Sequence, residues 1–160
     1  MTDMLVILRD LPPVNKEMLY LREDHQILVR RPIAPEKHIV VDWVDQQFGK
    51  GWASEVGVAF AHTPVTCFVA QQNKEILGFA GYELSAKSFF GPTGVLRDYQ
   101  GMGLGKVLLI KCLEALREMG YAYAIIGGVG PVAFYEKTVG AKVIEGSGNS
   151  IYADILKRKK

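Results

Sequence analysis

The stretch from Met102 to Met119 constrains the fold more than any other segment, because its apolar residues recur at helical spacing. They form one stripe along a helix, while the charged residues lie mainly off it. Gly120 follows at the position where a helix C-cap is expected. The segment therefore predicts a long amphipathic helix with one buried face, whose stripe consists of Leu104, Val107, Leu108, Cys112, Ala115, Leu116 and Met119.

Short β-branched and aromatic runs around this helix predict strands. A hairpin is expected over residues 65–70 and 76–84, joined by a polar turn. Residues 89–96 indicate a broken strand, because Pro92 removes a ladder donor and Gly94 marks close backbone approach. The order of elements predicts a single-domain α/β (α+β) fold with a mixed, mainly antiparallel sheet flanked by helices. Further strands are expected at 4–8, 27–33, 121–126, 141–144 and 151–155, a loop at 127–130, and helices at 16–23, 35–48, 53–60 and 131–137.

The composition is that of one globular domain, and its charge argues against a surface for nucleic acid. The 160 residues are 49% hydrophobic and 22% charged, with a net charge of +2. Four cations form the terminal run 157–160, and without these four, fifteen basic residues face seventeen acidic ones. A chain of this length buries roughly two-thirds of its unfolded surface, so it needs no disulfide or structural metal. We expect no nucleic-acid partner and no metal.

The cysteines and the amino terminus predict a cytoplasmic location. Cys67 and Cys112 are too few for a disulfide framework, and both sit among apolar residues, as buried free thiols do. The apolar run from Met4 to Leu8 is too short for a signal sequence or a membrane span. We therefore expect a reducing compartment and no membrane association.

A glycine-rich loop, residues 100–106, follows the broken strand and opens the long helix. Glycines allow the backbone to approach a ligand closely, and the first N–H groups of a helix have no partner within it. Together with the helix dipole, these donors suit a phosphate or pyrophosphate. By itself the pattern is also compatible with a tight turn that binds nothing.

Two common phosphate loops do not fit this segment. A Walker loop needs Ser or Thr after Gly105-Lys106, and Val107 stands there. A dinucleotide fingerprint needs Gly-x-Gly-x-x-Gly at the first strand-to-helix turn, whereas this loop comes late and follows an antiparallel hairpin.

A third pattern fits. Gln100, Gly103 and Gly105, preceded by residues 95–99, resemble the acetyl-coenzyme A loop of the GNAT family of N-acetyltransferases. Residues 133–141 resemble the second signature of that family, a short helix with Phe-Tyr followed by a glycine before a strand. The resemblance covers about residues 27–155. It implies a GNAT-like acyl-CoA N-acyltransferase domain at 27–160, with residues 1–26 as an amino-terminal extension packed on it.

The resemblance implies how the cosubstrate, acetyl-coenzyme A (acetyl-CoA), would bind. In that family the broken strand splays from the next strand, and its exposed backbone pairs with the pantetheine arm. The loop amides hold the pyrophosphate. Carried over to this sequence, the contacts fall on Thr93, Gly94, Val95, Gln100, Gly101, Met102, Gly103, Leu104, Gly105 and Lys106.

The resemblance also implies the chemistry, which is direct attack of an amine on the thioester. Tyr135 matches the tyrosine that faces the sulfur in this family, and a phenol there could donate a proton as coenzyme A departs. N–H groups near residues 94–96 could stabilise the oxyanion. The alternative for Tyr135 is packing alone, beside Phe134.

Two departures from the family pattern bear on this chemistry. Gly128 stands where many relatives carry asparagine, so free amides of the 127–130 loop would have to replace that side chain. Phe89 and Phe90 occupy the region where some relatives place the general base. The remaining candidates are Glu83, Glu55 and His62, or a water chain that ends on one of them.

The sequence leaves the acceptor and the role of the domain open. A small-molecule amine is favoured over a peptide, with specificity set by residues 1–26, 35–60 and 85–90. Trp43, Phe48 and Trp52 could line the acceptor site, although a core role is favoured. The alternative function is a non-catalytic sensor that binds acyl-CoA. Monomer and homodimer both remain open.

Overall fold

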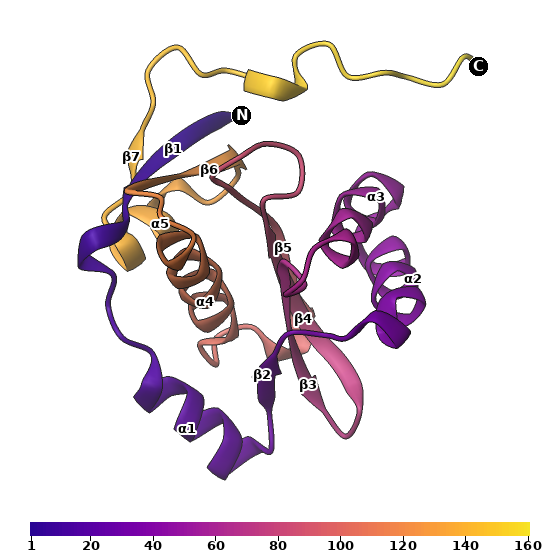
Figure 1. Ribbon diagram of the computed structural model, residues 1–160, viewed down its shortest axis with the longest axis vertical. Helices are drawn as coiled ribbons and strands as arrows, with labels where there is room; N and C mark the ends of the chain where they lie inside the picture. Colours follow the sequence, from indigo (N-terminus) through magenta and orange to yellow (C-terminus); the bar gives the residue numbers. More distant parts are fainter.

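A seven-stranded sheet organises the computed structural model, which describes residues 1–160 (Figure 1). Its strand order is β2-β3-β4-β5-β6-β1-β7. Every neighbouring pair is antiparallel except β5 and β6, which run parallel. This mixed, mainly antiparallel sheet confirms the predicted fold class. The strands are β1 (Thr2–Ile7), β2 (Leu28–Arg30), β3 (Cys67–Gln72), β4 (Glu75–Tyr82), β5 (Phe89–Val95), β6 (Tyr123–Val129) and β7 (Lys142–Val143).

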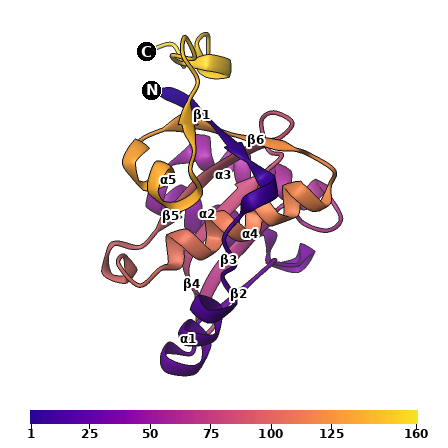
Figure 2. The ribbon, with the colours of Figure 1, turned by 90° about the vertical axis from the view of Figure 1, so that its left-hand side faces the viewer.

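Helices cover both faces of the sheet. In Figure 1, α4 and α5 lie on one side of β4 and β5, and α2 and α3 lie on the other. Figure 2 shows α1 at one end of the molecule and both chain termini at the opposite end. None of these helices is long and apolar enough to cross a membrane. The helices are α1 (Asn15–His25), α2 (Lys37–Phe48), α3 (Lys50–Val58), α4 (Leu104–Glu118) and α5 (Val132–Val139).

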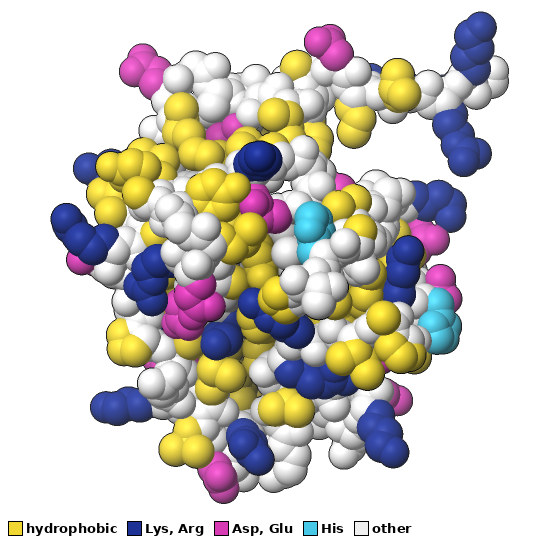
Figure 3. Space-filling model, in the orientation of Figure 1, with side chains coloured by type: hydrophobic (Ala, Val, Ile, Leu, Met, Phe, Trp, Pro, Cys, Tyr) yellow, Lys and Arg dark blue, Asp and Glu magenta, His cyan; other side chains and the backbone are white.

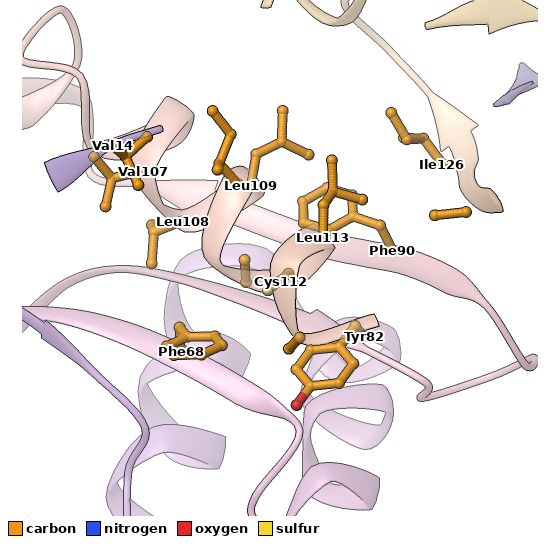
Figure 4. Close-up of a cluster of buried hydrophobic side chains, with 14 of the residues drawn as sticks. Val14, Phe68, Tyr82, Phe90, Val107, Leu108, Leu109, Cys112, Leu113 and Ile126 are labelled. Carbon is orange, nitrogen blue, oxygen red and sulfur yellow. The ribbon is translucent and has the colours of Figure 1, made fainter. Parts of the chain in front are cut away.

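The long helix predicted at 102–119 is α4, and its apolar stripe forms the centre of the larger core. Leu108, Cys112 and Leu113 are fully buried, and Figure 4 shows them between Phe68, Tyr82 and Phe90 of the sheet. Burying one such side chain contributes roughly 1.5–3 kcal/mol, so this packing fixes α4 against β3, β4 and β5. The amino end of α4 is thereby held beside the end of β5.

A smaller core lies on the opposite face of the sheet. Val40 and Val44 of α2 and Val56 of α3 pack against Val69 and Phe79. Gly49, with φ of 100°, ends α2 and allows α3 to start at once. The two helices therefore form a hairpin over β3 and β4.

The amino-terminal strand lies inside the sheet. β1 pairs with β6 on one side and with β7 on the other, and Met4 and Val6 are fully buried. Residues 1–26 thus include a strand of the same sheet as residues 27–160. The limits predicted for an extension and a domain stay a prediction.

Two predicted elements were wrong, and β1 explains the first. The loop expected at 127–130 is strand up to Val129, because Thr2 pairs with Val129 and extends the ladder. The strand expected at 151–155 is a single 3-10 turn, Ser150–Tyr152. β7 is therefore the edge strand of the sheet, next to β1.

Candidate active site

β5 and β6 part soon after they meet. Their parallel pairing is limited to Phe89 with Ile125 and Phe90 with Ile126. From Gly91 onward β5 pairs only with β4, and Pro92 has no N–H to offer a neighbour. The broken strand predicted at 89–96 is therefore a strand that keeps one neighbour and loses the other. The result is a gap in the sheet, bordered by β5 and β6.

The backbone of two β5 residues faces this gap. The Leu96 N–H donates to the Leu77 carbonyl at 2.8 Å. This bond sets the hydrogen-bonding register between β5 and β4. Hydrogen-bonded pairs alternate along antiparallel strands, so Gly94 also bonds to β4 while Thr93 and Val95 present their backbone groups to the gap. The Val95 carbonyl accepts a bond from Gln100 Nε2 at 3.3 Å. The amides of Thr93 and Val95 are the groups that could bind an extended ligand.

The glycine loop lies at the end of β5 and leads into α4. Gly101 and Gly103 have φ of 85° and 91°, a conformation that side chains other than glycine rarely adopt. Gly103 is the N-cap of α4, and no side chain caps the helix. No atom lies within 4 Å of a Cβ added at either glycine. The surface beside these glycines is open and no side chain caps the first amides of α4, as an anion site requires.

Lys106 binds a carboxylate of the amino-terminal segment. Its Nζ lies 3.2 Å from Glu17 Oε1 of α1, and both side chains are about one-third exposed. A hydrogen bond from its own backbone and then the Lys106 ammonium lower the pKa of Glu17. The Lys106 side chain is therefore tied to α1, and its backbone amide remains in the first turn of α4.

A groove of about 380 Å³ runs from the carboxyl end of α2 to the glycine loop. Phe48 borders it, and a methyl group added at Gly94 would overlap the Phe48 ring. Glycine at 94 is what allows the ring to lie on the backbone of β5. Trp43, Trp52 and Phe79 contact the same ring. Phe48 thus belongs to an aromatic cluster and also faces the groove, which the sequence posed as alternatives.

Tyr135 lies on α5 and is only 5% exposed. Its ring centroid is 5.1 Å from that of Phe134 and 6.3 Å from that of Phe90. Burial raises the pKa of its phenol to about 12. The hydroxyl therefore stays protonated over the whole physiological range, so it can donate a proton but cannot serve as a base at neutral pH.

The structure separates the three predicted base candidates. Glu83 accepts the Ser88 N–H within the β4–β5 connection and, at 2.7 Å, the hydroxyl of Tyr121 just before β6, so both of its oxygens have partners. His62 borders a different cavity, which also contains Tyr82 and the carboxyl end of α4. These contacts do not direct Glu83 or His62 toward the gap between β5 and β6.

Glu55 of α3 is the third candidate. Its Oε2 accepts the Ser85 hydroxyl at 2.5 Å and the Tyr152 hydroxyl at 2.9 Å, while its Oε1 has no partner in the protein. Burial, followed by the hydrogen bond to Glu55, raises the pKa of Tyr152 to about 12. The carboxylate thus joins α3, the β4–β5 connection and the carboxyl-terminal segment.

The amide of Gly128 is already in use. It donates to Asp3 Oδ1 at 2.9 Å, and Asp3 is 4% exposed. The expected role of free amides in the 127–130 loop is therefore wrong for Gly128. Sequence reasoning missed this contact, because a lone aspartate 125 residues away gives no local signal.

The two cysteines take no part in this site. Both are fully buried and unpaired. Burial raises the pKa of Cys67 to about 12 and raises the pKa of Cys112 as well, so neither thiol is a nucleophile at neutral pH. No group of three His, Cys, Asp or Glu side chains is placed to hold a metal ion.

Comparison with known proteins identifies the family. The model of the acetyltransferase (GNAT) family matches residues 35–141. This match includes β5, the glycine loop, α4 and Tyr135, so the chain belongs to the GNAT family of acetyltransferases, as the two sequence signatures predicted. A search of curated proteins by sequence found no match.

Solved structures share the fold at low sequence identity. One is a GCN5-related glucosamine N-acetyltransferase region of a fungal multi-domain β-N-acetylglucosaminidase (TM-score 0.70, 17% identity, 89% of this chain and 19% of that one). Another is a GCN5-related N-acetyltransferase from Sphaerobacter thermophilus (TM-score 0.67, 17% identity, 89% of this chain and 48% of that one). A third is the GNAT family N-acetyltransferase YhbS from Escherichia coli in complex with CoA (TM-score 0.52, 19% identity, 70% of this chain and 67% of that one). This chain thus spans less than half of the first two structures.

Proposed function

We propose that this protein binds acetyl-CoA in the gap between β5 and β6 and transfers the acetyl group to the amine of a small molecule. One observation carries the proposal. The uncapped amino end of α4, with open space at Gly101 and Gly103, adjoins the free edge of β5. A pyrophosphate suits the first feature, and the amide-rich pantetheine arm suits the second.

The residues present fit this cosubstrate. The amides of residues 103–106 would hold the pyrophosphate, and the backbone of Thr93 and Val95 would pair with pantetheine as a further strand would. Gln100 fixes the bend between the two by its bond to Val95. Gly101 and Met102 span the loop, and Gly94 lets Phe48 close the far side of the strand.

When bound, acetyl-CoA supplies a thioester whose carbonyl carbon bonds to the amine nitrogen as the carbon–sulfur bond breaks. Tyr135 would give its phenolic proton to the departing sulfur. The Val95 N–H would stabilise the developing oxyanion, because the Leu96 N–H already donates to Leu77. Tyr135 would recover its proton from solvent after the product leaves.

A base must also take a proton from the amine. An amine of pKa near 10.4 is charged at pH 7, and neutralising it costs about 4–5 kcal/mol. We assign this role to Glu55, directly or through one water, because its Oε1 is free while Oε2 is held by Ser85 and Tyr152. Phe48 and Trp52, both about one-third exposed, provide apolar surface for the acceptor near the same helices.

One observation favours the non-catalytic sensor as a second candidate. The Tyr135 hydroxyl is buried among Phe90 and Phe134, where a packing role would suffice. A sensor would bind the coenzyme with the same backbone groups and would release no thiol.

Calorimetry with CoA and acetyl-CoA, followed by a thiol-release assay with a panel of amines, tests the proposal. Binding with turnover on at least one amine supports the transferase. Binding without turnover on any amine favours the sensor, and the absence of binding would overturn both.

A further inference from the structure

A second cavity, of about 370 Å³, lies on the α4 side of the sheet. It is bordered by the segment after α3, by Tyr82 at the end of β4 and by the carboxyl end of α4. The candidate acetyl site adjoins the amino end of the same helix. The cavity shares no lining residue with the groove at Phe48. Its volume is within the range of small-molecule sites.

One wall of this cavity carries an unpaired cation. Arg31 stacks over Phe68 and Tyr82, with its guanidinium carbon 4.6 Å and 5.6 Å from the two ring centroids. Its hydrogen bonds, to the Val65 carbonyl and the Tyr82 hydroxyl, use only Nη1. No carboxylate lies within 4.0 Å of it, so Nε and Nη2 remain available to an anion.

Thr66 adds an unsatisfied donor at the same wall. Thr66 borders the cavity and is 5% exposed, and its buried hydroxyl has no hydrogen-bond partner in the protein. A buried hydroxyl without a partner costs roughly 1–3 kcal/mol. A bound carboxylate could accept from both Arg31 and Thr66.

The opposite wall is negative. Glu118 lies in the last turn of α4 and forms no ion pair or hydrogen bond in the structure. The carboxyl end of a helix carries partial negative charge, which favours a cation beside Glu118.

Acidic and basic side chains are interspersed on the face of the molecule shown in Figure 3, so no single-sign field dominates that face.

We propose that this cavity binds a free α-amino acid. The carboxylate would lie on Arg31 and Thr66, and the ammonium group on Glu118 and the end of α4. Arg31 and Glu118 border the same cavity and form no ion pair with each other, so one ligand could meet both charges. The site is separate from the acetyl site and stands whether or not acetyl transfer is demonstrated.

Thermal-shift screening of the full chain against the twenty common amino acids, up to about 10 mM, tests this site. Any hit is titrated by calorimetry, together with the matched analogues that lack either the ammonium or the carboxylate group. We expect one-to-one binding, weakened at least about tenfold by Arg31→Gln and by Glu118→Gln. Arg22→Gln and Glu23→Gln, on the surface of α1, are matched controls and should leave the affinity unchanged.

Because Arg31 also packs on Phe68, Thr66→Val provides a further variant if Arg31→Gln fails to fold. The absence of any hit would overturn the proposal. Equal binding of the analogue without the ammonium group would contradict a zwitterion site. Binding that is lost in Glu55→Gln or Gly105→Val but retained in the cavity variants would assign the amino acid to the acetyl site instead.

Discussion

At the scale of single residues, the site depends on glycines that serve different purposes. Gly103 needs its left-handed conformation to start α4, whereas Gly105 lies within the helix and needs only space. A Cβ at Gly105 would meet nothing closer than the Phe134 ring at 3.9 Å. Gly105 is therefore the cleaner position at which to separate binding from folding.

Gly105→Ala should stabilise the protein by about 0.5–1 kcal/mol, because glycine is unfavourable in a helix. The same methyl group should weaken CoA binding, and the larger Gly105→Val should weaken it at least about tenfold, because both side chains enter the pyrophosphate space. Calorimetry and thermal melts measure the two effects. Gly51→Ala in α3, also open, is the control that should stabilise without changing affinity. Unchanged CoA affinity in Gly105→Val would contradict the loop assignment.

Tyr135→Phe removes the proposed proton donor and keeps the ring that packs on Phe90. We expect turnover to fall ~10²-fold with little change in CoA affinity. Because the pKa of Tyr135 is raised to about 12, wild-type activity should show no loss from this group below pH 10. Tyr123→Phe, on an exposed residue of β6, is the control. Near-wild-type turnover of Tyr135→Phe would leave Tyr135 a packing residue.

At the scale of elements, most of the fold could be predicted from local pattern, whereas the pairing of β1 could not. The spacing of apolar residues predicts the stripe on α4. Pro92 predicts the break in β5. The place of β1 between β6 and β7 depends on contacts more than 100 residues apart, such as the bond from Gly128 to Asp3. Local periodicity carries no information about such pairing.

For the candidate site, the order of the strand and the loop could be read from the sequence, and their role in coenzyme binding stays a prediction. The Gln100–Lys106 loop and β5 lie side by side, as the family signature implied. Which β5 amides face the gap could not be predicted, since that depends on the register between Leu77 and Leu96. The contact of Phe48 with Gly94 likewise depends on where α2 docks.

Met4→Ala tests the position of β1. Because Met4 is fully buried in the larger core, the substitution should cost about 2–5 kcal/mol and lower the melting temperature. Leu156→Ala, at a residue that is 96% exposed, should change stability by less than about 0.5 kcal/mol. Equal melting temperatures for the two variants would mean that the amino-terminal strand is not part of the sheet.

The ion pair between Arg30 and Glu36 predicts an acid-dependent contribution to stability. Arg30 is the last residue of β2, with Nη2 2.6 Å from Glu36 Oε2, and this contact lowers the pKa of Glu36 to about 2. A carboxyl whose folded pKa is depressed stabilises the fold above its unfolded pKa, and that contribution is lost as the pH falls toward 2. Glu36→Gln should therefore lower the free energy of unfolding by about 1 kcal/mol at pH 7. In acid titrations followed by circular dichroism, the difference from wild type should shrink between pH 5 and about 2; a constant difference would contradict the assignment.

At the scale of the whole molecule, one helix connects the two proposed sites. The amino end of α4 offers free N–H groups beside the β5–β6 gap, and its carboxyl end borders the cavity between Arg31 and Glu118. Packing of the α4 stripe on the sheet fixes both ends at once. The net charge of the molecule contributes little to either site, because the excess of +2 comes from the exposed terminal residues.

The most direct test is a crystal structure of the protein with CoA. We expect the pyrophosphate oxygens within hydrogen-bond distance of the amides of residues 103–106, and the pantetheine arm alongside Thr93 and Val95 in the gap between β5 and β6. A coenzyme bound elsewhere, or a gap closed by the protein's own side chains at saturating CoA, would contradict the proposed acetyltransferase site.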